Sequence, residues 1–312
     1  MPRARVILNP LAGRAVPLAD LVRLLQPLEA DGWEITLAAT DLPGETTALA
    51  RAAVADGCEV VVAVGGDGTV NEVMQALVGT RVALGVLPTG TGNVWAAQVG
   101  IPTDLARAVK VLREGWLRRV DVGIAGDRYF LLMAGVGYDA AVTRSTSSKT
   151  KRRLGILAYV VAGVSVALGY VGWPMTINVN GDQRQYRALL VVLGNSRRYG
   201  GPVSVTAEAR IDDGLLDVCV FKGVGFLHAA WYVFAVLLGR HLRDPGVVYF
   251  RAARLRIGSE RTLFVQVDGE TIGTTPMAFG VRPRALSVVV PFAAAPGLFT
   301  AAEPSERLGG QT

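Results

Sequence analysis

Strand-like runs alternate with stretches of helical periodicity through the first third of the chain. The predicted strands are residues 5–8, 33–39, 60–64 and 82–87. The predicted helices are residues 18–30, 46–55, 70–77, 94–99 and 103–113. Pro27 is expected to bend or end the first helix. This alternation predicts a mostly parallel sheet with helices on both faces.

The pattern changes after about residue 124. Further strands are predicted at residues 128–133, 175–179, 186–193, 217–221, 253–257, 262–267 and 285–290. Asn180-Gly181-Asp182 is a hairpin signal between two of them. Two apolar helices, residues 154–171 and 226–238, interrupt the series. The second half therefore predicts an antiparallel β domain with helical insertions.

The run 60–64 consists of valine and alanine, which is typical of a strand buried on both faces. A glycine turn, Gly65-Gly66-Asp67-Gly68-Thr69, joins it to the next helix. Such a turn directs bare backbone N–H groups and the positive end of the helix dipole at one spot, which suits a phosphate. An ordinary turn between strand and helix is the alternative. Asp67 favours the phosphate site, because an acid beside phosphates is explained by a metal ion or a hydroxyl between them.

Other loops also follow predicted strands. Asn9, Thr40 and residues 89–93 lie at the carboxyl ends of strands, as the glycine turn does. Ligands of open α/β sheets bind at that edge, so we expect these loops to converge. Thr69 and Thr91 suit phosphate binding, although a helix cap uses the same geometry. The chain has neither a Walker-type phosphate loop nor a dinucleotide glycine motif after its first strand.

Two turns in the second half carry carboxylates. Residues 265–270 end in Asp268-Gly269-Glu270, and residues 211–215 contain Asp212-Asp213. Each turn alone is typical of a tight hairpin. Their interpretation depends on the rest of the chain.

Composition narrows the class of partner. The 312 residues are 51% hydrophobic and carry a formal charge of +6, which favours an anionic partner. Nucleic acid is not expected, because basic and aromatic residues are not interleaved. Cys58 and Cys219 are predicted to be buried thiols in a reducing compartment.

One stretch is long enough to span a bilayer. Residues 154–173 are 20 residues without a charge. They include four glycines and a serine, and Pro174 follows, so a buried or surface-lying helix is favoured. The basic cluster of Lys149, Lys151, Arg152 and Arg153 could hold such a helix on anionic lipid.

A series of motifs runs in order from residue 9 to residue 270. The motifs are Asn9-Pro10 with Gly13, Gly65-Gly66-Asp67-Gly68-Thr69 with Asn71-Glu72, Leu87-Pro88-Thr89-Gly90-Thr91-Gly92-Asn93, Asp121-Val122-Gly123, Ala134-Gly135-Val136-Gly137-Tyr138-Asp139, Gly194-Asn195 with Gly200-Gly201, Asp212-Asp213-Gly214-Leu215-Leu216-Asp217 and Asp268-Gly269-Glu270. The series resembles the diacylglycerol kinase and sphingosine kinase superfamily, particularly the bacterial soluble lipid kinases. NAD kinases and, more loosely, phosphofructokinases share the glycine-aspartate turn alone.

This resemblance implies an NAD-kinase/diacylglycerol-kinase-like α/β nucleotide domain plus a β-sandwich second domain. The first would span residues 1–124, with residues 292–312 returning to it, and the β-rich lipid-substrate domain would span 125–291. ATP would be bound by Asn9, Thr40, Gly65, Gly66, Asp67, Gly68, Thr69, Asn71 and Thr91.

The resemblance also implies roles for the carboxylates. Glu270 matches the general base, and Asp67 would act in catalysis near Mg²⁺. A second, structural magnesium ion would be held by the Asp213 side chain and the backbone carbonyls of Arg210 and Leu215.

The implied activity is transfer of the γ-phosphate of ATP to the hydroxyl of a diacylglycerol-like or sphingoid-like lipid presented at a membrane surface. We expect a cytoplasmic protein that contacts the inner face of the membrane peripherally. A homodimer is possible, but the sequence does not determine the oligomeric state. An NAD-kinase-like small-molecule kinase and a non-catalytic lipid or nucleotide sensor are the alternatives. Val94 and Pro202 depart from common family motifs and leave the lipid unsettled.

Overall fold

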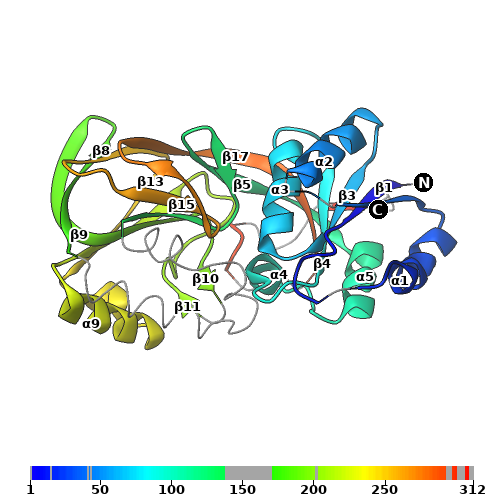
Figure 1. The fold of residues 1–312 in the computed structure, drawn as a ribbon, viewed down its shortest axis with the longest axis horizontal. Helices are drawn as coiled ribbons and strands as arrows, with labels where there is room; N and C mark the ends of the chain where they lie inside the picture. The colour runs from blue at the N-terminus through cyan, green and yellow to red at the C-terminus, as the bar shows by residue number, and fades with distance from the viewer. Residues whose placement is uncertain are drawn as a thin grey trace. The chain divides into compact units, whose positions relative to one another are not determined.

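The computed structural model describes residues 2–14, 16–40, 42, 44–137, 171–200, 203–292, 297–300 and 306–308. The chain groups into two compact units (Figure 1). Unit 1 comprises residues 1–122 with 283–312, and unit 2 comprises residues 123–282. The predicted class, an α/β domain and a sheet-rich domain, is confirmed. The domain boundaries drawn from the sequence stay a prediction.

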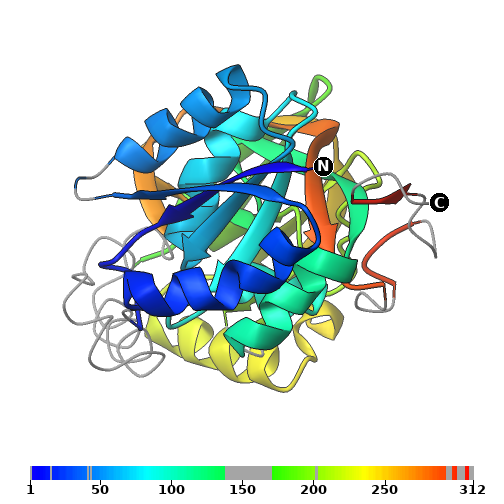
Figure 2. The ribbon, with the colours of Figure 1, turned by 90° about the vertical axis from the view of Figure 1, so that its right-hand side faces the viewer.

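Unit 1 is a parallel sheet covered by helices. Its elements are β1 (Arg3–Leu8), α1 (Leu18–Ala30), β2 (Glu34–Ala39), α2 (Glu45–Ala55), β3 (Val60–Gly65), α3 (Asp67–Leu77), β4 (Ala83–Pro88), α4 (Val94–Val99) and α5 (Leu105–Glu114). The strands lie in the order β2-β1-β3-β4, all parallel, and the end of β17 (Met277–Val290) joins beside β4. Helices α2 and α3 pack together on one face, and α1 and α5 on the other (Figure 2).

Burial explains why the central strands form. Every residue of β3 and of β4 is buried, as expected for strands covered on both faces. Helix α5 begins where the Asp104 carboxylate accepts the Arg107 N–H at 2.9 Å. Helix α1 continues to Ala30, so Pro27 does not end it.

The last part of unit 1 comes from the C-terminal region. The predicted strand 285–290 is the end of β17, whose 14 residues pass from unit 2 into unit 1. Arg284 within it has a positive φ of 46°, and its N–H donates to Asp121 Oδ1 at 2.6 Å. Strand β5 (Trp116–Ala125) was not predicted, and β18 (Glu306–Arg307) pairs with its first residues. The Arg118 guanidinium lies 4.6 Å from the ring centre of Phe299.

Unit 2 is built from antiparallel strands. Its elements are β6 (Arg128–Phe130), β7 (Met133–Gly137), β8 (Trp173–Val179), β9 (Asp182–Gly194), β10 (Arg198–Gly200), β11 (Val203–Ser204), β12 (Leu216–Lys222), α9 (Phe226–Leu237), η1 (His241–Arg243), β13 (Val247–Ala252), β14 (Arg254–Ser259), β15 (Phe264–Val267), β16 (Glu270–Thr274) and the first part of β17. The first half of β9 pairs with β8, and its second half pairs with β7 and with β12. Apolar side chains from β7, β9, β12 and β15 form a core in this unit.

The predicted hairpin and the second of the two predicted helices, residues 226–238, are confirmed, the helix as α9. Asn180 and Gly181 have φ values of 52° and 92° in the turn between β8 and β9, which fits the turn that Asn-Gly favours. The predicted strand 128–133 is wrong as a single strand, because the chain bends at Leu131 and Leu132 between β6 and β7. Strands β13 and β16 were missed.

Several predictions lie outside the described residues. They concern Tyr138, Asp139, the basic cluster at 149–153, nearly all of the apolar stretch 154–173, and Pro202. Within the described ranges, no helix is long and apolar enough to cross a membrane.

Both cysteines are free and buried, as predicted. Cys219 lies on β12 with no exposed surface, and burial raises the pKa of its thiol to about 12. The thiolate is the reactive form, so we expect no alkylation of Cys219 by iodoacetamide at about pH 8 in the folded protein. Mass spectrometry should detect complete labelling in denaturant. Labelling of native Cys219 at the rate of a free thiol would contradict this burial.

Candidate functional site

The glycine turn leaves the start of α3 open. Gly66 occupies the N-cap position, and no side chain in the described part of the chain caps the helix. The Val70 N–H donates to the Gly66 carbonyl at 3.0 Å, so the N–H groups of Gly68 and Thr69 precede the first intrahelical bond. These N–H groups and the helix dipole can receive an anion.

The loops after the parallel strands meet at one edge of the sheet, as predicted. The backbone N–H groups of Asn9, Thr40 and Thr89 each donate to a carbonyl of a neighbouring strand at 3.0 Å. These bonds extend the ladders one residue beyond the strands. Asn9, Thr40, Gly66 and Thr89 therefore lie at the carboxyl ends of adjacent strands.

Two glycines let these loops approach backbone to backbone. A Cβ on Gly13 would lie 2.2 Å from the Thr89 carbonyl oxygen. A Cβ on Gly90 would lie 2.4 Å from Gly66 Cα. Gly13 also has a φ of 56°, which favours glycine. The loop arrangement thus requires glycine at Gly13 and Gly90.

The predicted side chains at this edge are partly brought together. Asn9 Nδ2 donates to Thr69 Oγ1 at 3.2 Å, and Thr69 is buried. The Thr40 hydroxyl donates to the Leu8 carbonyl at 3.4 Å. Asn71 is buried, and its carbonyl oxygen accepts from Gln75 at 3.0 Å. Their hydrogen bonds tie these side chains to the fold.

Gly65 and Gly68 differ in the space around them. A Cβ on Gly65 would lie 2.3 Å from Thr69 Oγ1, whereas one on Gly68 would meet nothing within 4 Å. Gly68 and Thr91 are exposed. These two predicted residues therefore face solvent.

Asp67 has a contact that the sequence did not predict. Its Oδ1 accepts the Trp95 N–H at 3.0 Å, so the carboxylate caps α4. Burial raises the pKa of Asp67, and backbone N–H bonds from residues 93–95 oppose that rise. Val94 and Trp95 are buried in the core. Asp67 therefore links the glycine turn to the loop before α4.

Thr89 and Asn93 lie in the predicted loop 89–93, but the predicted nucleotide-binding set did not include them. Both are buried, and Thr89 Oγ1 and Asn93 Oδ1 have no hydrogen-bond partner among the described residues. Asn93 Nδ2 donates to the Gly90 carbonyl at 2.7 Å. The motif 87–93 marked this loop, but it did not show which side chains are buried.

In unit 2, Glu270 follows a tight turn. Asp268 and Gly269 have φ values of 46° and 84°. Glu270 begins β16, is exposed, and pairs through Oε2 with Arg128 Nη2 at 3.0 Å. The sequence gave no signal for Arg128, which lies 142 residues away.

The Asp268 carboxylate holds this turn against the start of β7. It accepts the N–H groups of Leu131, Leu132 and Met133 at 2.8, 2.9 and 3.0 Å. These bonds explain the bend that divides β6 from β7.

We expect Asp268→Ala to lower the free energy of unfolding by about 2–4 kcal/mol, since hydrogen bonds to a charged group contribute more than neutral ones. Urea unfolding measures the change. Asp268→Asn keeps one carbonyl oxygen and should lose less, whereas equal stability of Asp268→Ala and the parent protein would contradict the anchoring role.

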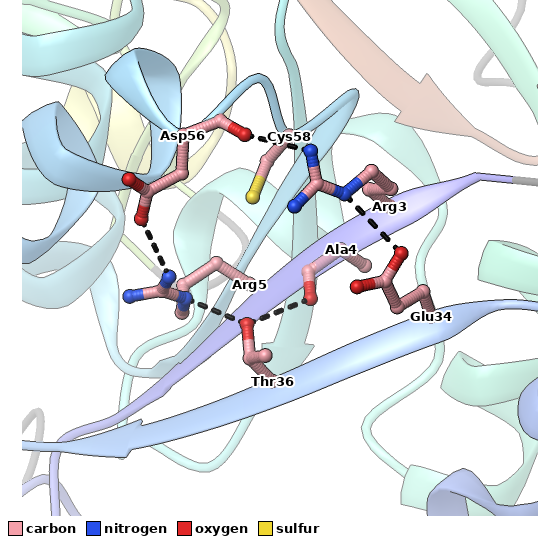
Figure 3. Close-up of a pocket in the computed structure, with 7 residues that line it drawn as sticks. All are labelled: Arg3, Ala4, Arg5, Glu34, Thr36, Asp56 and Cys58. Carbon is pink, nitrogen blue, oxygen red and sulfur yellow. Dashed lines mark hydrogen bonds and ion pairs between the residues drawn. The ribbon is translucent and has the colours of Figure 1, made fainter.

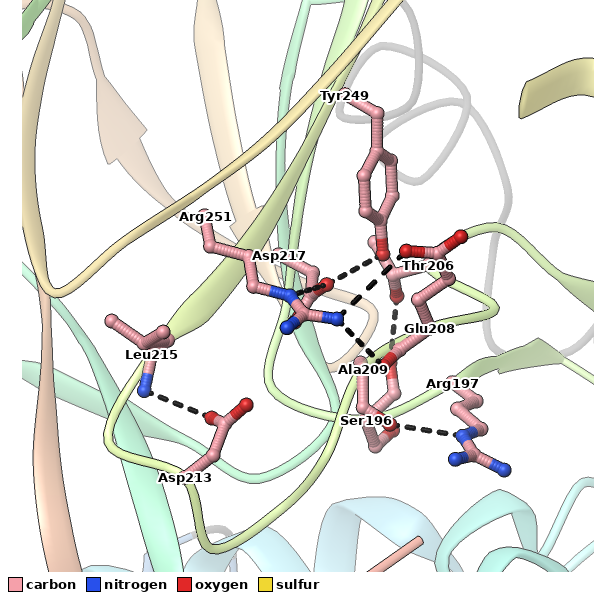
Figure 4. A network of polar contacts seen from close by, with 10 residues as sticks. All are labelled: Ser196, Arg197, Thr206, Glu208, Ala209, Asp213, Leu215, Asp217, Tyr249 and Arg251. Atoms are coloured by element: carbon pink, nitrogen blue, oxygen red, sulfur yellow. Dashed lines mark hydrogen bonds and ion pairs between the residues drawn. The ribbon is translucent and has the colours of Figure 1, made fainter. Parts of the chain in front are cut away.

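A second acidic turn lies before β12 (Figure 4). Asp213 Oδ1 accepts the Leu215 N–H at 3.1 Å, whereas Arg210 is exposed. The buried Asp217 accepts the Tyr249 hydroxyl at 2.6 Å and Arg251 Nε at 3.1 Å, both on Oδ1.

Burial raises the pKa values of both Asp213 and Asp217. Asp217 Oδ2 is buried without a hydrogen-bond partner in the described part of the chain. No group of three His, Cys, Asp or Glu residues able to hold a metal occurs among the described residues. Any cation here would also need backbone or water oxygens.

A pocket in unit 1 lies away from these loops, at the amino ends of β1 and β2 (Figure 3). Arg5 pairs with the Asp56 carboxylate at 2.9 Å. Arg3 pairs with Glu34 at 3.2 Å and donates to the Asp56 carbonyl. Both guanidinium groups are therefore engaged within the protein, which disfavours this pocket as a phosphate site.

Two families match successive parts of the chain. The diacylglycerol kinase catalytic domain family matches residues 3–125. The YegS C-terminal NAD kinase beta sandwich-like domain family matches residues 133–290.

Curated proteins are similar over nearly the whole chain. Diacylglycerol kinase of Bacillus subtilis is 31% identical over 294 residues, which cover 93% of this chain and 97% of that protein. Diacylglycerol kinase of Staphylococcus carnosus is 31% identical over 291 residues, covering 93% and 95%. Diacylglycerol kinase of Staphylococcus aureus is 32% identical over 291 residues, covering 93% and 92%.

Solved structures share the fold. The crystal structure of a diacylglycerol kinase from Bacillus anthracis has a TM-score of 0.72 and 23% sequence identity. The alignment covers 94% of this chain and 98% of that chain.

Proposed function

The chain belongs to the diacylglycerol kinase catalytic domain family and is a lipid kinase, and we propose that it transfers the γ-phosphate of ATP to the hydroxyl of a diacylglycerol-like or sphingoid-like lipid. The main observation in favour of nucleotide binding is the uncapped N-terminus of α3, where the loops after four parallel strands meet. Phosphoryl transfer depends mainly on positioning and on neutralising charge, which such a site suits.

The geometry of unit 1 supports ATP as the donor. Backbone N–H groups at Gly68 and Thr69 would bind phosphate oxygens at the positive end of the α3 dipole. The buried oxygens of Thr89 and Asn93 lack partners among the described residues, so nearby water or ligand donors would satisfy them. The proposed nucleotide-binding set is completed by Asn9, Thr40, Asn71 and Thr91. Those side chains that form hydrogen bonds within the protein would hold the loops in place.

Glu270 is the proposed general base. It is exposed at the start of β16, where its carboxylate can accept the proton of a lipid hydroxyl. Asp268 fixes the turn beneath it through three backbone N–H groups, and Arg128 holds its Oε2. Both contacts restrict the positions that the carboxylate can adopt.

Magnesium is the proposed divalent ion. Mg²⁺ bound with ATP is held by one or two carboxylates and the phosphates, and Asp67 supplies a carboxylate beside the glycine turn. When bound, the ion neutralises charge on the transferring phosphate. Asp213, with the carbonyls of Arg210 and Leu215, would hold a second, structural ion. Asp217 Oδ2 lies nearby and has no hydrogen-bond partner among the described residues, so it has spare acceptor capacity.

A transfer assay tests the proposal. Mg-ATP labelled in its γ-phosphate is offered with mixed micelles of diacylglycerol, sphingoid bases, phosphatidylglycerol or undecaprenol, and separately with NAD. Label on one lipid, reduced in Glu270→Gln, is the expected result and identifies the substrate. Label on NAD alone would overturn the lipid reaction in favour of an NAD-kinase-like activity. ATP binding without label on any acceptor, including a native lipid extract, would favour a sensor.

A further inference from the structure

Apart from His228 and the buried Tyr232, helix α9 carries apolar side chains. Its 12 residues include no Asp, Glu, Lys or Arg. Ala229, Tyr232 and Ala235 are buried and pack in a cluster with Val192 and Phe221 of the sheet. One side of the helix is therefore buried against the rest of unit 2.

The opposite side of α9 is apolar but exposed. We call it the α9 face, and it comprises Phe226, Leu227, Trp231, Val233, Phe234, Leu237 and the following Leu238. Their exposed fractions run from 38% to 80%. A helix on a protein surface ordinarily carries polar residues on its outer face. A contiguous apolar patch of this kind marks an interaction surface.

Basic residues flank the α9 face at both ends. Lys222 precedes the helix, and Arg240 and Arg243 follow it, both exposed. Asp244 is the one acidic residue between positions 222 and 246. Its carboxylate accepts the Trp231 Nε1–H at 2.6 Å and the Gly246 N–H at 2.7 Å. The flanks of the face are thus positively charged.

We propose that the α9 face docks on an anionic lipid layer, an inference that rests on the proposed lipid acceptor. Apolar side chains of a surface helix enter the boundary between headgroups and acyl chains. Tryptophan favours that interface, and Arg240 and Arg243 would pair with anionic headgroups. A second copy fits less well, because a twofold contact would bring the basic flanks of both copies together.

Helix α9 is packed against the part of unit 2 that carries the proposed base. Met133 packs in the same cluster as the inner side of α9. Its N–H donates to Asp268, two residues before Glu270. The α9 face and the Glu270 turn therefore belong to one packed body.

Vesicle flotation with the full chain tests the proposal. The probes are vesicles of phosphatidylcholine alone and vesicles containing about one third phosphatidylglycerol. Wild type is compared with the double variant Leu227→Glu/Phe234→Glu and with Arg240→Gln/Arg243→Gln. Leu37→Glu is the matched control, because Leu37 is an exposed leucine on β2 in unit 1. Circular dichroism establishes that each variant is folded.

We expect wild type and Leu37→Glu to bind anionic vesicles, and Leu227→Glu/Phe234→Glu to lose at least tenfold in affinity. Arg240→Gln/Arg243→Gln should lose about fivefold per charge on anionic vesicles, with little change on neutral ones. Unchanged vesicle binding by the leucine–phenylalanine variant would overturn the proposal. A dimer that becomes monomeric in that variant, with vesicle binding retained, would overturn it in favour of a second copy.

Activity on a dispersed short-chain lipid separates docking from the reaction. Leu227→Glu/Phe234→Glu should keep its rate on that lipid while losing rate on vesicles. Equal loss on both substrates would overturn a docking role. Absence of lipid phosphorylation by wild type would instead overturn the proposed function, and flotation would still decide whether the α9 face binds lipid.

Discussion

Replacing Glu270 by glutamine is expected to lower kcat for lipid phosphorylation by about 10²–10⁴-fold, the range typical of losing a general base. Glutamine keeps the size of the side chain and an oxygen that can accept from Arg128, but it cannot take a proton from the acceptor hydroxyl. The KM for ATP should stay within about twofold of wild type, because ground-state nucleotide binding does not need this proton transfer. Steady-state kinetics on the lipid identified by the transfer assay measure both constants.

Glu260→Gln is the matched control for that experiment. Glu260 is an exposed glutamate in the same unit, immediately after β14, and the substitution removes the same charge. Its kcat should remain within about twofold of wild type, since it has no assigned role in proton transfer. A Glu270→Gln enzyme with a wild-type kcat would rule out the proposed base.

The alternation of strands and helices in unit 1 could be predicted because its central strands are buried on both faces. The valines of 60–64 are covered on both faces, so hydrophobicity alone marks the strand, and β3 extends one residue further to Gly65. The convergence of the loops followed from the direction of parallel strands, and the backbone bonds of Asn9, Thr40 and Thr89 confirm it.

Two strand predictions were incomplete because the chain is interrupted within the strand region. Strand β17 carries Pro283 and the positive-φ residue Arg284 in its middle, so only its apolar end was recognised. The bend within 128–133 depends on Asp268, which lies more than 130 residues away. No local pattern can report such a contact, because its partner comes from a distant part of the chain.

In the candidate site, too, the local sequence pattern predicted the loops but not the contacts between residues far apart in the chain. Glycine and acid residues marked the loops at the strand ends, and the carboxyl ends of parallel strands meet at one edge of the sheet. The sequence could not show that Asp67 bonds to Trp95 N–H, or that Glu270 pairs with Arg128. It singled out Thr91, which is exposed, rather than Thr89, whose buried hydroxyl lacks a partner within the described ranges.

Replacing Gly90 by alanine is expected to raise the KM for ATP, or to lower kcat/KM, by about 10²-fold. The new Cβ would lie 2.4 Å from Gly66 Cα and 2.9 Å from Asn93 Oδ1. Backbone atoms cannot turn aside as a flexible side chain can, so the glycine turn and the loop before α4 must separate by about 1 Å. A displacement of that size can reduce a rate by about 10²-fold. Isothermal titration with an ATP analogue and steady-state kinetics measure the loss.

Gly85→Ala is the control that distinguishes displacement of these loops from a general loss of stability. Gly85 lies on β4 of the same sheet, and its new Cβ would lie 2.6 Å from Leu112 Cδ2 inside the core. Both variants should lose about 1–3 kcal/mol of stability through overpacking. Only Gly90→Ala should lose nucleotide affinity in the folded protein, because only its Cβ meets the loops at the carboxyl edge. Equal ATP affinity of folded Gly90→Ala and Gly85→Ala would mean that the nucleotide does not depend on the contact between Gly66 and Gly90.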